Sequence, residues 1–237
     1  MKKNRIANLI FIFIIIQLLS GFYLPANAQI KKNFYPISDS YVTNQYPENN
    51  YGNLDCLTVA NYTDKVAYVF IMFDLSDIPN NAYIKSGTLT LQSIYIGRSR
   101  EFALLVPNSV GAYKSENINW EETEINWNNK PECSEDNWLD SRPVNVPDDV
   151  DIWDISNGIR DNGTYLITTT GKLTIVLKAY HEETGFYSKE SDYSPKLKIK
   201  YLERDPIIII QIIVAVSVIA VVILVGYIYL RRRRKKK

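Results

Sequence analysis

The chain has 237 residues, with 27 Lys and Arg against 26 Asp and Glu and a formal net charge of +1. Three of the cations precede residue 6 and seven follow residue 230, which leaves 17 cations against 26 acids in residues 29–206, a net charge of −9. An acidic domain is repelled by nucleic acid and by anionic lipid, so we expect no nucleic-acid partner.

The first 28 residues have the pattern of a secretory signal peptide. Lys2, Lys3 and Arg5 precede an apolar run from residue 6 to residue 24. The sequence Ala26-Asn27-Ala28 then supplies small residues at the two positions that a signal peptidase reads. We predict cleavage after Ala28, and the alternative is an uncleaved signal anchor.

Residues 29–205 carry the patterns of strands. The apolar run "VAYVFIMFDL" at 66–75 predicts a central strand buried on both faces. Alternating apolar and polar residues predict half-buried strands, and these lie at 87–96, 172–179 and 196–202. Further candidates are 54–62, 102–108 and 164–170. The segment "DIWDISNGIRDNG" is the one helical candidate, capped by Asp154 or Ser156. Many short strands and one short helix predict an all-β domain, a jelly-roll-like two-sheet β-sandwich.

Two features of this domain suggest an extracellular location. Cys56 and Cys133 are the only cysteines, and a disulfide between them would persist outside the cell. In the chain-entropy model it would stabilise the fold by about 4 kcal/mol. Two free thiols are the alternative. Asn61 and Asn162 begin the sequons Asn-Tyr-Thr and Asn-Gly-Thr, which predict N-glycosylation.

The segment "NINWEETEINWNNKP" at 117–131 contains the triplet Ile-Asn-Trp twice. Seven residues separate Trp120 from Trp127, which would align them on a helix and place them on opposite faces of an unbroken strand. An all-β domain and the nearby Pro131 favour a loop that leads into a strand. We expect Trp127 to pack in the sandwich and Trp120 to be the more exposed of the two.

Residues 206–230 have the pattern of a transmembrane helix. Ile207 to Leu230 contains a single strongly polar residue, Gln211. At helical rise this run is about 36 Å long, enough for a hydrocarbon core of about 30 Å. Seven cations at 231–237 follow directly and predict a cytoplasmic tail; a nucleic-acid-binding tail is the alternative. We therefore expect a single-pass protein of the cell membrane, with residues 29–205 outside.

Five segments in order resemble the DNRLRE domains, which are grouped with carbohydrate-binding modules of disaggregatase-type proteins. The segments are "SDSYVTNQYPENNYGNLDCLTVAN", "YVFIMFDLSDIPNNAYIKSGTLTL", "NWEETEINWNNKP", "IWDISNGI" and "FYSKESDYSPKLKIKY". Together they span almost all of residues 29–205. The resemblance implies a jelly-roll β-sandwich of the carbohydrate-binding type without catalytic residues.

Aromatic side chains are the expected sugar contacts, because a flat ring complements the apolar face of a pyranose. Four aromatic residues fall in polar or loop-like contexts, and these candidates are Trp120, Trp138, Tyr113 and Tyr187. For each of them a packing role is the alternative.

Calcium is the metal that this sequence favours most. It binds six to eight carboxylate and carbonyl oxygens, and jelly-roll binding modules often hold one structural ion. We name Asp39 or Asp74 as a candidate ligand. The two cysteines lack the paired spacing of a zinc site.

Catalysis has little support in the sequence. His181 is the sole histidine and is expected to be an ordinary surface residue, and no serine lies in a Gly-x-Ser-x-Gly motif. Glycosidases need two carboxylates at a defined separation. The large number of Asp and Glu residues does not by itself show that such a pair exists.

We therefore expect a non-enzymatic, membrane-anchored surface protein that binds a glycan or a surface glycoprotein, in adhesion or in cell-envelope organisation. One alternative is a structural envelope component that binds a neighbouring membrane protein. A polysaccharide-degrading enzyme is the third reading.

Overall fold

The computed structural model describes part of the chain, and its largest described part is the predicted β domain. The described residues are 29–79, 82–94, 108–144, 149–161, 165–166 and 171–202, with five further positions after residue 215. The chain divides into two units, one of residues Gln29–Glu203 and one of Met1–Ala28 with Arg204–Lys237. The predicted signal peptide, the strand at 102–107 and the sequon at Asn162 lie outside the described residues.

The predicted membrane span at 206–230 also lies almost wholly outside the described residues. Among the residues that are described, no helix is both long enough and apolar enough to cross a membrane. The span, the signal peptide and the cytoplasmic tail therefore stay predictions.

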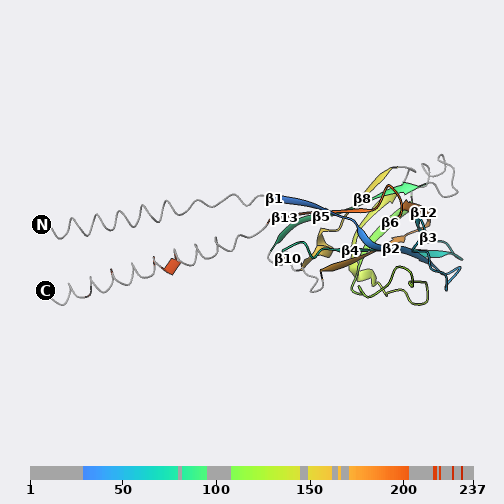
Figure 1. The fold of residues 1–237 in the computed structure, drawn as a ribbon, viewed down its shortest axis with the longest axis horizontal. Helices are drawn as coiled ribbons and strands as arrows, with labels where there is room; N and C mark the ends of the chain where they lie inside the picture. The colour runs from blue at the N-terminus through green and yellow to red at the C-terminus, as the bar shows by residue number, and fades with distance from the viewer. Residues whose placement is uncertain are drawn as a thin grey trace. The chain divides into compact units, whose positions relative to one another are not determined.

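Figure 1 labels most strands of the domain, among them β2, β4 and β6. One layer of the domain contains five antiparallel strands. In hydrogen-bonded order they are β2 (Pro36–Thr43), β4 (Val66–Asp74), β11 (Lys172–Ala179), β6 (Asn108–Ser115) and β7 (Trp138–Val144). The central strands β4 and β11 are buried on both faces. The prediction that 172–179 is half-buried is therefore wrong, because β11 lies between β4 and β6 and its outer face is covered as well.

The other layer contains β1 (Gln29–Phe34), β13 (Lys196–Leu202), β5 (Tyr83–Ile94) and β8 (Val150–Asp154). The strands β12 (Glu182–Tyr187) and β3 (Cys56–Asn61) connect the two layers. β12 pairs with the end of β5, and β3 pairs with the start of β4. The small elements are η1 (Glu135–Asn137), α3 (Ser156–Ile159), β9 (Arg160–Asp161) and β10 (Tyr165–Leu166). In the predicted helical segment, only α3 is helical, because β8 occupies its first half.

The main core lies between the two layers. It contains Val69, Ile71 and Phe73 of β4 together with Leu197 and Ile199 of β13. Strands from the two ends of the hydrogen-bonded path thus share one apolar cluster, so the sheet packs against itself as a sandwich. The all-β prediction is confirmed, and the predicted alternation of β13 holds. The jelly-roll name for the connectivity stays a prediction.

A second apolar cluster covers the outer face of β4, β11 and β6. Phe70 and Met72 of β4 and Val176 of β11 point to this face and contact Trp120 and Ile125. These two residues belong to the long loop between β6 and η1, so that loop shields the outer face from water. The prediction that the run 66–75 is buried on both faces is confirmed.

Trp120 is a packing residue, and our expectation that it is exposed is wrong. The residue is 7% exposed. Its ring meets that of Phe70 edge to face at 6.1 Å between centroids, and its Nε1 donates to Thr174 Oγ1 at 3.1 Å. Its neighbours Asn119 and Glu121 are exposed, while its indole fills the second cluster.

Trp127 packs on the same outer face, and not in the sandwich core as we expected. It is half-buried, with its ring 5.4 Å from that of Tyr68. The ammonium of Lys130 lies 3.8 Å from the centre of the Trp127 ring. Both tryptophans therefore hold the loop on the sheet.

The predicted disulfide between Cys56 and Cys133 is wrong, because both cysteines are free thiols. Cys56 begins β3 and pairs with Tyr187 of β12. Cys133 packs against the second cluster, with its Sγ 3.6 Å from the carbonyl oxygen of Lys114. Burial raises the pKa of both thiols, which lowers the fraction of reactive thiolate.

Because no disulfide closes the loop, we expect a reducing agent to leave the Tm of the protein unchanged. Thermal unfolding followed by circular dichroism with and without the reductant measures this. A fall in Tm of several degrees on reduction would show that a disulfide contributes to stability.

Candidate functional site

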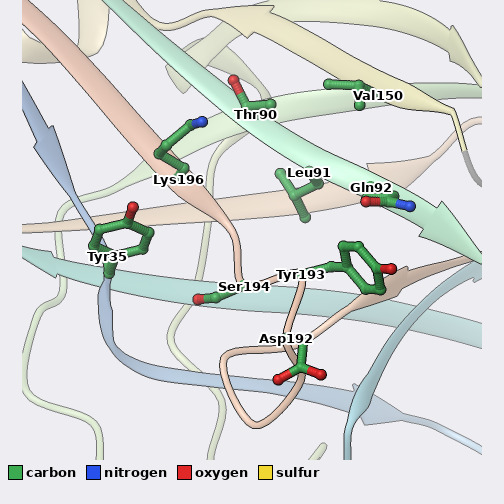
Figure 2. Close-up of a pocket in the computed structure, with 9 residues that line it drawn as sticks. All are labelled: Tyr35, Thr90, Leu91, Gln92, Val150, Asp192, Tyr193, Ser194 and Lys196. Atoms are coloured by element: carbon green, nitrogen blue, oxygen red, sulfur yellow. The ribbon is translucent and has the colours of Figure 1, made fainter.

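A cleft of about 290 Å³ opens beside the outer face of the β1-β13-β5-β8 layer (Figure 2). Its floor comes from the end of β5, and its sides come from β8, β13 and the loop that follows β12. The lining residues are Tyr35, Thr90, Leu91, Gln92, Val150, Asp192, Tyr193, Ser194 and Lys196.

The register of the strands places the polar groups of the floor. Leu89 and Leu91 of β5 are buried in the core, so Thr90 and Gln92 point to the opposite face. Lys196 of β13 pairs with Thr90, and Val150 of β8 pairs with Gln92. The strand pattern thus brings a hydroxyl, an amide, an ammonium and an apolar side chain to one surface.

Two exposed tyrosines flank this surface. Tyr35 lies between β1 and β2 and is 59% exposed, and Tyr193 lies in the loop after β12 and is 53% exposed. In Figure 2 they lie on opposite sides of Ser194. Exposed aromatic rings beside hydroxyl, amide and charged groups are the surroundings that a sugar ring requires.

The loop that carries Tyr193 is held by its own hydrogen bonds. Ser188 Oγ lies 2.7 Å from the carbonyl oxygen of Leu54 and 2.9 Å from Glu190 Oε2, and its single proton can be donated to either; Ser191 Oγ donates to the carbonyl oxygen of Ser188 at 2.8 Å. The N–H of Tyr193 donates to Ser191 Oγ at 3.1 Å. The ring of Tyr187 packs 4.9 Å from that of Tyr193. A loop fixed in this way loses little conformational entropy when a ligand binds.

The four predicted sugar contacts do not form one site. Tyr187 supports Tyr193 but does not line the cleft. Tyr113 is buried, with the ammonium of Lys178 at 4.6 Å from its ring centre. Trp138 is 50% exposed and lies opposite Tyr113 in the β6–β7 pair, far along the hydrogen-bonded path from the cleft strands. Trp120, as described above, is buried.

The sequence reasoning missed Tyr35 and Tyr193. Tyr35 precedes Pro36 at a junction of two strands and belongs to no motif. Tyr193 lies in "SDYSP", where an aromatic residue stands among turn-forming residues, and that context could have nominated it.

The remaining predicted positions have separate surroundings. Asp39 is buried in β2 beside two glutamates, whereas Asp74 is exposed and its Oδ1 accepts from the N–H of Ser76 at 2.9 Å. The side-chain Nδ2 of Asn61 donates to the carbonyl oxygen of Tyr180 at 3.0 Å, and N-glycosylation there stays a prediction. His181 is exposed, as expected.

Asp151 of β8 lies on the face of the strand opposite to Val150, and it is a pH-sensitive group. Its Oδ2 is buried and accepts no hydrogen bond from the described residues. Burial, and secondarily Asp149, raises the pKa of Asp151 to about 7, although a hydrogen bond with Ser93 opposes the shift. The ionised form is therefore unfavourable in the folded protein.

The pKa of Asp151 is higher in the folded protein than in the unfolded chain. The stability that this group contributes is therefore fully present below about pH 4, and it is lost as the pH rises through about 7. Replacing Asp151 with asparagine should raise the free energy of unfolding at pH 8 by about 1–2 kcal/mol, after allowance for solvent screening. At pH 4 the variant should match the original. Urea denaturation at both pH values measures the difference, and an equal effect at both would contradict this assignment.

The fold defines a β-sandwich domain with a cleft beside one of its layers. Residues 30–201 match the model of carbohydrate-binding module family 96, and the chain belongs to this family. The match supports the carbohydrate-binding part of the sequence resemblance, and the DNRLRE name stays a prediction. No curated protein matches the chain.

Solved structures show only distant similarity. The unassembled VP1 pentamer of KI polyomavirus is 10% identical, with a TM-score of 0.32 over 77% of this chain and 96% of that one. The cleaved adhesin domain of Lys-gingipain from Porphyromonas gingivalis is 9% identical, with a TM-score of 0.23 over 75% and 99% of the two chains. Eiger TNF from S. frugiperda is 8% identical, with a TM-score of 0.26 over 75% and 96%. TM-scores this low carry no argument about function.

Proposed function

We propose that this protein is a non-catalytic, membrane-anchored surface protein that binds a glycan, free or on a glycoprotein, in the cleft between Tyr35 and Tyr193. Membership of a carbohydrate-binding module family supports the ligand class. The single observation that supports the location is the cleft itself, where two exposed tyrosines flank hydroxyl, amide and charged groups.

The chemistry of the lining residues suits a sugar ring. The phenol rings of Tyr35 and Tyr193 offer apolar faces to the C–H bonds of a pyranose. Thr90, Gln92 and Ser194 carry neutral donors and acceptors for sugar hydroxyls. This combination of a few polar groups with aromatic walls is typical of small-molecule sites.

The same lining supports a binding role over a hydrolytic one. Asp192 is the one carboxylate among the nine residues that line the cleft. Glycosidases of the common type use two carboxylates on opposite sides of the scissile bond. We therefore assign the cleft to recognition.

The anchoring part of the proposal rests on the sequence. The apolar segment 206–230 and the cationic residues 231–237 have the pattern of a membrane span with a cytoplasmic end. A glycan-binding domain on such an anchor would serve adhesion or cell-envelope organisation.

The proposal is tested with the full-length chain in a detergent without a sugar headgroup, because a glycoside detergent would compete for the cleft. Binding to a glycan array identifies the ligand, and calorimetry measures its Kd. Specific binding to at least one glycan is expected. Failure to bind any glycan, with crosslinking to a neighbouring membrane protein, would replace this proposal with a structural role in the envelope.

A further inference from the structure

The side chain of Asp39 is buried with one carboxylate oxygen unpaired. The residue is 1% exposed. Its Oδ2 accepts from the backbone N–H of Lys189 at 2.8 Å. Its Oδ1 is buried and accepts a hydrogen bond from none of the described residues. An unpaired buried carboxylate oxygen is costly, so its surroundings need an explanation.

Two glutamates from distant parts of the chain face Asp39. Glu122 comes from the loop after β6, and its Oε1 accepts from the backbone N–H of Asp39 at 2.7 Å. Glu190 comes from the loop of the cleft, and its Oε2 lies 2.9 Å from Ser188 Oγ. One oxygen of each of the three carboxylates lies within 4.8 Å of the other two.

The charges of this cluster do not balance. Among the described residues, Lys189 is the cation at the cluster, with its Nζ 3.0 Å from Glu122 Oε2 and 2.6 Å from Glu190 Oε1. No ion pair joins that ammonium to Asp39 among the described residues. Three ionised carboxylates and one ammonium leave two negative charges uncompensated.

We propose that Asp39, Glu122 and Glu190 form a binding site for Ca²⁺, with the ammonium of Lys189 as an internal competitor for the same oxygens. Ca²⁺ takes hard oxygen ligands in flexible geometry, and carboxylates from separate loops can bind it through one or both oxygens. Asp39 Oδ1 is available as a ligand, since it accepts no hydrogen bond from the described residues. The side chain of Lys189 is 24% exposed, so it has a route to solvent when the cation enters.

The site would join three segments that are far apart in the sequence. Asp39 lies in β2, Glu122 lies two residues after Trp120, and Glu190 lies three residues before Tyr193. Bound Ca²⁺ would hold the loop of the second cluster and the loop of the cleft to the same strand. If the cleft binds glycan as proposed, Ca²⁺ should therefore also strengthen that binding by ordering Tyr193.

The competing account is that the cluster needs no metal, because Lys189 neutralises the glutamates and a proton neutralises Asp39. The two accounts differ in what removal of the ammonium does. Without Lys189 the metal site loses its competitor, so replacing Lys189 with methionine should tighten Ca²⁺ binding.

The test is calorimetric titration of the metal-free full-length protein with CaCl₂ or MgCl₂ in the absence of glycan, together with the Tm in Ca²⁺ and in chelator. We expect Ca²⁺ to bind and to raise the Tm, and Mg²⁺ to bind more weakly. Asp39→Asn and Glu190→Gln should each weaken Ca²⁺ binding by about tenfold or more. Asp74→Asn is the matched control and should change nothing.

Circular dichroism shows whether each variant is folded, and the more exposed Glu190 keeps the test valid if the Asp39 variant is not. Absence of Ca²⁺ binding by the unchanged protein would overturn the proposal, even if Lys189→Met binds the ion. Equal binding by Asp39→Asn, Glu190→Gln and Asp74→Asn would also overturn it. Because no glycan is present, a negative result would leave the proposed function of the cleft untouched.

Discussion

Replacing Trp120 with alanine is expected to lower the free energy of unfolding by about 3–5 kcal/mol. The indole is buried against Phe70 on the outer face of the sheet, and its Nε1 donates to the buried hydroxyl of Thr174. Truncation would leave a cavity in the second cluster and an unpaired hydroxyl. Urea denaturation of the full-length protein, followed by circular dichroism, measures the change.

Two further variants separate the contributions of Trp120. Trp120→Phe keeps an aromatic ring but removes the hydrogen bond to Thr174. Loss of that bond should lower the free energy of unfolding by about 1 kcal/mol, in addition to any loss of packing. Trp138→Ala removes a tryptophan that is 50% exposed and should change stability by less than about 0.5 kcal/mol. If Trp120→Ala were no more destabilising than Trp138→Ala, the outer face of the sheet would not depend on the loop as the structure indicates.

Replacing Tyr193 with alanine is expected to weaken glycan binding by about tenfold or more, which corresponds to about 1.4 kcal/mol. Tyr193 is an exposed ring at the edge of the cleft, and it is positioned by Tyr187 and by the hydrogen bonds of its loop. Aromatic residues held in this way contribute most of the affinity at many binding sites. Tyr35→Ala should have an effect of similar size.

Tyr46→Ala is the matched control for these two substitutions. Tyr46 is 60% exposed and lies in the turn after β2, outside the residues that line the cleft. Its removal should leave the Kd unchanged. An equal loss of affinity in all three variants would indicate a general effect of removing exposed tyrosines.

The main features of the sandwich follow from local patterns in the sequence. Alternation in 196–202 and the apolar run in 66–75 identify their strands and the faces that each strand buries. Because β4 is buried on its second face as well, another segment of the chain must cover that face. Its identity depends on contacts between residues about 50 positions apart, which periodicity does not encode. For this reason Trp120, with polar neighbours, reads as exposed although it supplies that cover.

The cleft was beyond the reach of local patterns for the same reason. Tyr35 and Tyr193 lie at opposite ends of the domain sequence, and the pairing of β1 with β13 brings their two segments together. The disulfide prediction failed because the count of two cysteines in one domain says nothing of the distance between them. Asp39, in contrast, was one of the two candidate calcium ligands named from the sequence, and the structure places it in an acidic cluster.

The most direct test of the glycan-binding cleft is calorimetric titration of the full-length protein, and of its Tyr193→Ala, Tyr35→Ala and Tyr46→Ala variants, with a glycan selected on the array. We predict that the unchanged protein and Tyr46→Ala bind with the same Kd, while Tyr193→Ala and Tyr35→Ala bind at least about tenfold more weakly. Binding that survives both cleft substitutions unchanged would contradict the assignment of the glycan site to this cleft.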